Sequence, residues 1–170
     1  GGVIIYGGRN ASKVRSNAVF TFLDQPGILG FGAPADPSIR YTWASPANLG
    51  QPPRPTEGPS CVSLNSTCFL VFGGRSEFSE WDTLHMACDA FSGEVTWTEL
   101  WGTGLEASPA PRQRAGTAVV KGSSVGIAAE QVLLVVGGSS GGVALADVWA
   151  FALPPAAAAW TSLPSLPRAL

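Results

Sequence analysis

The chain has 170 residues, which is enough for one folded domain with a hydrophobic core. Its formal charge of −2 and the scatter of its few basic residues exclude the electrostatic footprint of a nucleic-acid-binding protein. Glycine (21 residues) and proline (14 residues) are interleaved with hydrophobic residues that make up 45% of the chain, a pattern that indicates short strands and frequent turns rather than disorder.

Three apolar runs end in a glycine pair, and this is the first sign of an internal repeat. The pairs lie at residues 7–8, 73–74 and 137–138, so that they recur after 66 (7 to 73) and 64 (73 to 137) positions. An apolar run that ends in this way predicts a buried strand that enters a tight turn.

The same further features follow each glycine pair in the same order. A loop leads to a second expected strand, and a tryptophan opens or lies within a third. The second strands are expected at residues 19–22, 83–86 and 148–151, and the tryptophans are Trp43, Trp97 and Trp160. An aspartate, Asp82 or Asp147, precedes two of the second strands, where we expect it to form turn hydrogen bonds. A Pro-Arg pair then precedes the next unit, at residues 53–54, 111–112 and 167–168.

This order of features resembles the kelch repeat, in which a Pro-Arg opening, a glycine pair, an Asp-x-aromatic strand and a tryptophan follow one another. The resemblance covers essentially the whole chain. It implies an all-β fold, namely a segment of a kelch-type β-propeller with four-stranded antiparallel blades. The recurring tryptophans are then expected to pack between blades rather than to stack on a ligand.

The resemblance divides the chain into four parts. Residues 1–49 form a partial blade with three strands and a long loop, residues 50–103 and 104–164 form complete blades, and residues 165–170 start another. A closed propeller takes roughly 4 to 8 blades, so the ring is expected to be incomplete. The remaining blades are expected from the same chain or from another one.

Residues for catalysis or metal binding are sparse. His85 is the one histidine, and the three cysteines do not have the spacing of zinc ligands. We therefore expect no enzyme activity, no metal and no cofactor. No apolar run reaches the ~20 residues of a membrane-spanning helix, so we also expect no membrane span.

The cysteines and two sequons bear on the cellular compartment. Cys61 and Cys68 flank an expected hairpin and are candidates for a disulfide across it. Asn10 and Asn65 each begin an Asn-x-Ser/Thr sequon in an expected loop and are candidate glycosylation sites. Together these features favour an extracellular or lumenal protein. We favour the alternative, in which the thiols are reduced, the sequons arise by chance and the protein is cytoplasmic.

The loops that follow the glycine pairs join the second to the third of the four strands in each blade, and they define the expected partner surface. The face on which these loops emerge commonly binds partners in proteins of the family. These loops are residues 9–16, 75–81 and 139–146. Their candidate partner-binding residues are Arg9, Lys13, Arg15, Arg75, Glu77, Phe78, Glu80 and Trp81. Alternatively, Phe78 or Trp81 packs on its own blade. The apolar residues Ile28, Leu29 and Phe31 in the loop 24–40 are candidates for a second contact, or for folding over the blade.

The sequence therefore predicts a non-catalytic kelch-propeller module for protein–protein interaction or scaffolding, as part of a longer chain or a multi-subunit assembly. One alternative is an extracellular or lumenal glycosylated propeller that serves structural assembly or adhesion. A more remote alternative is the propeller domain of an enzyme whose active site lies in absent blades.

Overall fold

The structure is a computed structural model that describes residues 2–24, 41–102 and 107–168. Within these residues the chain is all-β with one short 3-10 helix, Gly122–Val125, which confirms the all-β part of the predicted fold class. The sheets are predominantly antiparallel, and none closes on itself. Most of the loop 24–40, with Ile28, Leu29 and Phe31, lies outside the described residues, so its predicted contact stays a prediction.

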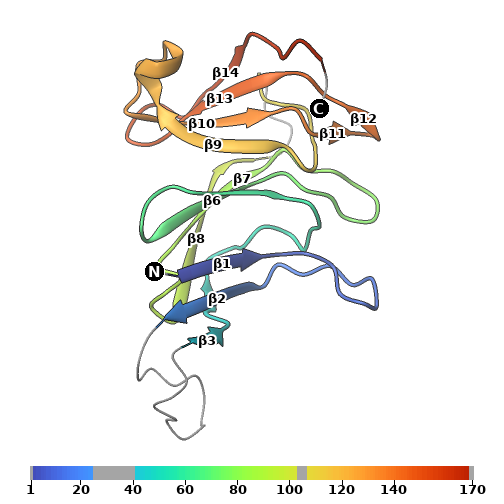
Figure 1. Cartoon of the computed structure of the whole chain (residues 1–170), viewed down its shortest axis with the longest axis vertical. Coiled ribbons are helices and arrows are strands. Elements are labelled where there is room, and N and C mark those ends of the chain that lie inside the picture. Colours follow the sequence, from blue (N-terminus) through green and yellow to red (C-terminus); the bar gives the residue numbers. More distant parts are fainter. Residues whose placement is uncertain (1, 25–40, 103–106, 169–170) are drawn as a thin grey trace, which may run out of the picture.

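Three sheets are stacked on one another in the order of the sequence (Figure 1). Sheet 1 contains β1 (Gly2–Tyr6), β2 (Val19–Asp24) and β3 (Tyr41–Ala44). Sheet 2 contains β5 (Ser60–Ser63), β6 (Cys68–Phe72), β7 (Leu84–Cys88) and β8 (Glu94–Trp101). Sheet 3 contains β9 (Gly116–Lys121), β10 (Gln131–Val136), β13 (Val148–Ala152) and β14 (Trp160–Leu163). A small hairpin, β11 (Ser139–Ser140) with β12 (Val143–Ala144), extends the loop between β10 and β13.

The register of the strands places the three recurring tryptophans at equivalent positions. Trp43 pairs with Phe22 across β2 and β3, Trp97 with Ala87 across β7 and β8, and Trp160 with Phe151 across β13 and β14. In each sheet the tryptophan therefore lies on the same face, which in sheets 2 and 3 is the face turned towards the preceding sheet.

Two hydrophobic clusters fill the spaces between neighbouring sheets. Between sheets 1 and 2, Tyr6 packs on Trp97 with their ring centroids 5.3 Å apart. Between sheets 2 and 3, Phe72 packs on Trp160 with their centroids 5.5 Å apart. Burial on both faces explains the nearly continuous apolar run in β6, since neither face of such a strand is left to solvent.

The glycine pairs form the corners at which one sheet meets the next. Gly73 has φ +65°, and a Cβ added to it would lie 2.5 Å from the carbonyl oxygen of Arg112. The N–H of Gly74 donates to that same carbonyl at 2.8 Å. In sheet 1 the N–H of Gly8 donates in the same way to the carbonyl of Thr56, at 3.1 Å. The glycines therefore allow the segment that leads into the next sheet to lie directly against the turn.

These contacts correct the alignment of two predicted motifs. Because Thr56 and Arg112 receive equivalent hydrogen bonds, the counterpart of Arg112 is Thr56 and not the predicted Arg54. The N–H groups of Gly73 and Gly137 donate to the carbonyls of Thr83 and Asp147, respectively. The counterpart of Asp147 is therefore Thr83 and not Asp82. The Pro-Arg and Asp features thus recur in the sequence without recurring at the same place in the sheets.

Asp147 forms an ion pair in addition to its place at a turn. The buried guanidinium of Arg112 donates to both carboxylate oxygens of Asp147, at 2.6 and 2.7 Å, and also to the carbonyl of Gly137. These hydrogen bonds lower the pKa of the Asp147 carboxyl. The pair fastens the segment before β9 to the turn after β10, within sheet 3.

The edge of sheet 2 carries one strand that the sequence assigned elsewhere. β4 (Ala47–Leu49) runs parallel to β8 as a fifth strand, and the Trp97 indole N–H donates to the Asn48 side chain at 2.7 Å. Residues 47–49 therefore belong structurally to sheet 2, whereas the sequence placed them in the unit 1–49.

Gly73→Ala tests the corner contact. The left-handed backbone alone costs an alanine about 1–2 kcal/mol, and the approach to the Arg112 carbonyl should cost a further ~1–3 kcal/mol of unfolding free energy. Gly126→Ala is the matched control, since Gly126 has a similar φ of +74° but has no atom within 4 Å of an added Cβ. Urea denaturation of both variants measures the difference, and equal losses would contradict the close approach.

Candidate functional site

Three loops leave the stacked sheets on the same side, which is the right-hand side in Figure 1. They are residues 9–16, 75–81 and 139–146, and they join β1 to β2, β6 to β7 and β10 to β13. The segments that lead into β5 and β9 run between them, because Ser16 bridges to Thr56 and Gln113 bridges to Ser139. We call these loops and leading segments the loop face.

Glu57 lies at the centre of one half of the loop face. Its carboxylate accepts hydrogen bonds from Arg75 Nε at 2.7 Å and from Arg15 at 3.5 Å, and Arg9 Nε lies 3.1 Å from its second oxygen. These arginines come from two different loops. Only 14% of the Glu57 side chain is exposed, because the guanidinium groups cover it.

The surroundings of Glu57 set its charge and hold the loops in place. The hydrogen bond from Arg75, aided by the charges of Arg9 and Arg15, lowers the pKa of the Glu57 carboxyl below its ordinary value of 4.5. Backbone hydrogen bonds of 3.0 Å run in both directions between Glu57 and Arg75. A single exposed ion pair contributes little, but a carboxylate shared by three arginines forms a network that fixes loop positions.

Glu80 connects the second loop to the third. One of its carboxylate oxygens accepts the backbone N–H of Gly141 at 2.8 Å, and the other accepts the side-chain amide of Gln113 at 3.3 Å. Gly141 lies in the turn between β11 and β12. Two carboxylates, Glu57 and Glu80, therefore tie the three loops into one continuous surface.

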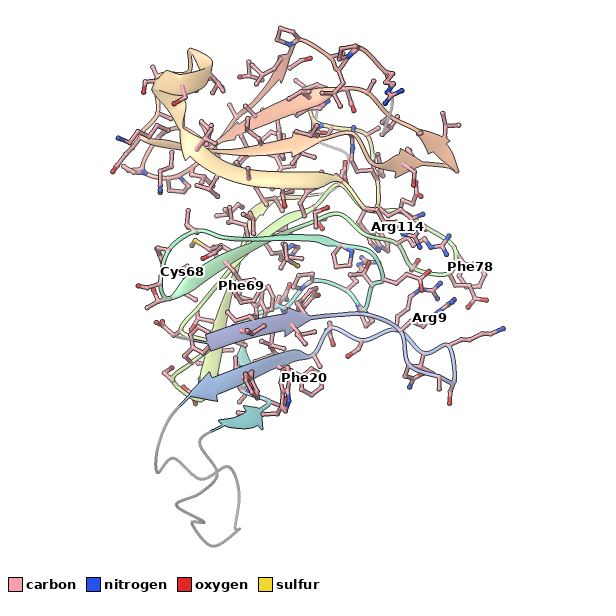
Figure 2. All side chains as sticks on the ribbon, in the orientation of Figure 1. Arg9, Phe20, Cys68, Phe69, Phe78 and Arg114 are labelled. Carbon is pink, nitrogen blue, oxygen red and sulfur yellow. A yellow bond between two sulfur atoms is a disulfide. The ribbon has the colours of Figure 1, made fainter. Side chains whose placement is uncertain are left out.

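Phe78 projects from this surface. Its side chain is 90% exposed, the highest value among the exposed large hydrophobic residues that the structure describes. The turn that carries it is closed by a hydrogen bond of 2.7 Å from the Ser76 N–H to the Ser79 carbonyl, and the Ser76 hydroxyl accepts the Phe78 N–H. Figure 2 shows Phe78 on the same side of the molecule as Arg9 and Arg114.

The other candidate partner-binding residues differ in how far they are exposed. Trp81 is half-buried, and the Arg54 guanidinium lies 4.8 Å from the centroid of its ring. Lys13 and Glu77 are exposed. The alternative in which an aromatic residue packs on its own sheet therefore does not describe Phe78, whereas Trp81 is partly covered.

Sequence reasoning missed Glu57, Gln113 and the exposed Arg114 as members of this surface. All three lie in the segments that lead into the inner strands β5 and β9. Because strand direction alternates within an antiparallel sheet, those segments emerge on the same side as the loops that were singled out. Topology therefore places them there, although no motif marks them.

The cysteine pairing differs from the predicted one. Cys68 forms a disulfide with Cys88, which lies directly opposite it across β6 and β7, and Cys61 is an exposed free thiol opposite Val71. The prediction of a Cys61–Cys68 bond is therefore wrong, because the register of the β5–β6 hairpin does not bring these residues opposite each other. Both sequon residues, Asn10 and Asn65, are exposed in turns.

His85 lies in the core rather than in a reactive cluster. It is 5% exposed, and its Nε2 lies 3.4 Å from a carboxylate oxygen of Glu99. Burial lowers the pKa of its imidazole, although Glu99 opposes this effect. The described residues contain no group of three or more histidine, cysteine or acidic side chains that could hold a metal ion. Nor do they include a helix of the length and apolar character required to cross a bilayer.

Neither a scan against protein-family models nor a search of curated proteins gave a match for this chain.

Glu57→Gln tests the network that braces the loop face. Since the pKa of Glu57 is lowered on folding, its contribution to stability is present above about pH 4.5 and is lost as the pH falls through the folded-state pKa. The variant should be less stable than the wild type at pH 7 and should lose less stability between pH 7 and pH 3. Urea unfolding across this range measures both effects.

Glu77→Gln is the matched control, because Glu77 is exposed in the same group of loops. It should leave both the stability and its pH dependence unchanged. If the stability of the two variants depends on pH in the same way, Glu57 does not form its ion pairs with the arginines when the protein is in solution.

Proposed function

We propose that this chain is part of a kelch-type β-propeller and acts, without chemistry of its own, as a protein-binding or scaffold module. The loop face is the surface that binds the partner. The recurrence of glycine pairs and tryptophans at equivalent places in three stacked sheets supports the repeat. The exposed Phe78 on a braced turn is the observation that carries the binding role.

The setting of Phe78 favours binding over a structural role. A large apolar side chain that is 90% exposed contributes nothing to the core of this chain. Its turn is held by the hydrogen bonds of Ser76 and by the neighbouring Arg75–Glu80 bridge, so little conformational entropy is lost when a partner covers it. Aromatic anchors next to arginines are the residues on which protein interfaces most depend.

The charges around Phe78 define the kind of partner. Basic residues outnumber acidic ones on the loop face, and Glu57 and Glu80 are already engaged by its own arginines, an amide and a backbone N–H. The exposed basic groups are Lys13 and Arg114, together with the outer parts of Arg9 and Arg75, and they outnumber Glu77, the exposed acidic residue of the described loop face. The matching partner is a protein with an apolar pocket for Phe78 and acidic residues around that pocket.

Phe78→Ala is the direct test of this function. Proteins bound to the tagged chain in extracts of its own cells are identified by cross-linking, and the affinity of a purified partner is then measured. The variant should lose at least ~2 kcal/mol of binding, or about 30-fold in Kd, because a desolvated aromatic anchor is removed. Its denaturation midpoint should not change, because Phe78 lies outside the core.

Leu49→Ala is the control, since Leu49 is an exposed apolar residue on β4 and not on the loop face. It should bind the partner as the wild type does. Equal binding by Phe78→Ala and wild type would refute the loop face as the partner surface. Trp81 is unsuitable for this comparison because it is half-buried.

A second candidate function is the extracellular or lumenal form of the same module, in structural assembly or adhesion. The Cys68–Cys88 disulfide favours it, since such bonds persist in oxidising compartments. Asn65 adds support because its Oδ1 accepts the N–H and hydroxyl of Thr67 and the N–H of Cys68. This turn holds the sequon at the tip of the β5–β6 hairpin, with the side chain exposed.

Reduction of Cys68–Cys88 should lower the free energy of unfolding by about 3 kcal/mol, since the bond closes a loop of about 20 residues in the unfolded chain. The protein from its native source should have the mass of the disulfide form under non-reducing conditions. Cys61→Ser should leave both the presence of the disulfide and the stability that is lost on its reduction unchanged. A native protein with three free thiols would remove the support for the oxidising compartment.

A further inference from the structure

The arginines around Glu57 bring together more positive charge than this carboxylate neutralises. Backbone bridges place Arg9 opposite Arg15 and Glu57 opposite Arg75. Three guanidinium groups share one carboxylate, so the four residues, which we call the arginine cluster, have a net charge of +2. Like charges directly opposite each other destabilise a pair of strands, and a further anion would therefore stabilise the cluster.

The cluster also has hydrogen-bond donors that Glu57 does not use. The Nε of Arg15 is buried, and no atom of the described residues accepts its hydrogen bond. The shortest contact of Arg9 with Glu57 is made by its Nε and not by its two Nη groups. The side chains of Arg9 and Arg75 are 43% and 41% exposed, so a soluble anion can reach the cluster from the surface.

A fourth arginine lies next to the cluster. The Arg114 N–H donates to the carbonyl of Gly58, the residue after Glu57, at 2.8 Å. The Cγ of Arg114 lies 3.2 Å from the position that a Cβ on Gly58 would occupy, so its side chain begins beside the cluster. Arg114 is exposed, and Figure 2 shows it on the same side of the molecule as Arg9 and Phe78. It therefore extends the positive charge along the loop face.

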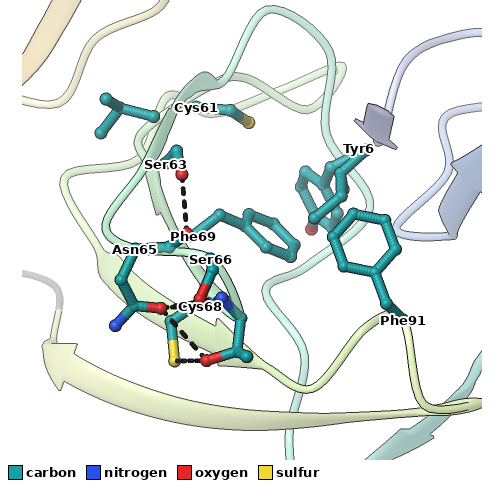
Figure 3. Close-up of a pocket in the computed structure, with 11 residues that line it drawn as sticks. Tyr6, Cys61, Ser63, Asn65, Ser66, Cys68, Phe69 and Phe91 are labelled. Atoms are coloured by element: carbon teal, nitrogen blue, oxygen red, sulfur yellow. Dashed lines mark hydrogen bonds between the residues drawn. The ribbon is translucent and has the colours of Figure 1, made fainter. Parts of the chain in front are cut away.

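The cavities in the described part of the chain do not gather positive charge in this way. The cavity of about 440 Å³ beside Tyr6 and Phe91 is lined by apolar and uncharged polar residues (Figure 3). A smaller cavity of about 170 Å³ contains the guanidinium of Arg54, but it also contains the carboxylate of Glu99. The arginine cluster on the loop face is therefore the better place for an anion.

We propose that the arginine cluster binds a phosphorylated serine or threonine side chain of the partner protein. The inference rests on the proposed function, because the phosphate belongs to the partner that the loop face binds. A phosphate monoester has a charge of about −1.5 to −2 at pH 7 and three strong acceptor oxygens. This charge balances that of the cluster, and arginine binds phosphate through two parallel N–H···O bonds. A single carboxylate would supply less charge and fewer oxygens.

A phosphorylated protein suits the surroundings of the cluster better than an anionic membrane does. Phe78 lies three residues after Arg75 on the same turn and provides an apolar anchor for a polypeptide beside the phosphate. Glu77 is exposed between these two residues. A layer of anionic headgroups would bring further negative charge against the Glu77 carboxylate, whereas a single phosphorylated side chain approaches the cluster alone.

The test uses the 170-residue chain and synthetic peptides that differ at one position. They have the sequence Gly-Gly-X-Gly-Gly, in which X is phosphoserine, glutamate or serine. Binding is followed by the NMR signals of the arginine side chains. At pH 7 the phosphoserine peptide should bind with a Kd of about a millimolar and the glutamate peptide at least about fivefold more weakly. The serine peptide should cause no shift.

The pH dependence of binding separates a phosphate from a carboxylate. The second pKa of a phosphate monoester is about 6, so lowering the pH from 7 to about 5.5 should weaken the phosphoserine peptide about threefold. The Glu57 carboxyl stays ionised in this range, because its arginine partners hold its pKa below the ordinary value of 4.5. The glutamate peptide should show no such change, because its carboxylate also stays ionised.

Two variants of the protein provide a matched pair within one loop, since each removes one positive charge. Arg9→Gln should weaken the phosphoserine peptide at least about fivefold, because Arg9 belongs to the cluster. Lys13→Gln should change its affinity less than about twofold, because Lys13 is exposed outside the cluster. The denaturation midpoint of each variant is measured alongside. Phe78→Ala should bind this peptide as the wild type does, since the peptide has no apolar side chain.

The proposal is overturned if the phosphoserine and glutamate peptides bind equally, if neither binds at about 20 mM, or if both charge variants weaken binding equally. Co-sedimentation with phosphatidylserine vesicles, in place of peptide binding, would assign the cluster to a membrane surface and would also overturn it. These results leave the proposed function separate, because the role of Phe78 is decided by the affinity of Phe78→Ala for the partner protein.

Discussion

The constraint on which this structure depends is that each sheet has two apolar faces. An alternating strand can leave one face in water, but β6 buries residues of both faces and so requires a sheet on each side. Stacking is possible only where successive sheets can approach closely at their corners. The glycine pair provides this approach, because at Gly73 any side chain would meet the carbonyl of Arg112. The order of the sheets, the inter-sheet clusters and the position of the loop face all follow from this contact.

The same constraint explains which parts of the fold could be predicted. Glycine pairs and tryptophans marked equivalent places because each makes a contact between sheets that few other residues can make. The Pro-Arg pairs did not, since the contact that recurs in the leading segments is the carbonyl of Thr56 or Arg112, and the Arg112 side chain adds its ion pair in sheet 3 alone among the described residues. The disulfide was mispredicted because hairpin register, and not distance along the chain, decides which residues are opposed.

The candidate site was predictable in outline only. The sequence indicated the three loops and most of their charged residues, but it could not show that Glu57 and Glu80 bind across from one loop to the next. It left open which aromatic residue is exposed, and only the turn geometry distinguishes Phe78 from Trp81. A kelch-type propeller with a protein-binding loop face, as proposed here, needs such cross-links because loops that move independently would lose entropy on binding.

The central claim is that equivalent faces of the three sheets are covered by the preceding sheet where one is present. Trp43, Trp97 and Trp160 report on this directly, because they are equivalent by register but are 52%, 5% and 7% exposed. Fluorine NMR of fluorotryptophan-labelled protein, assigned by single Trp→Phe substitutions, measures the solvent isotope shift at each. The account predicts a large shift at Trp43 and small shifts at Trp97 and Trp160. Similar shifts at all three tryptophans, or a large shift at Trp97, would contradict it.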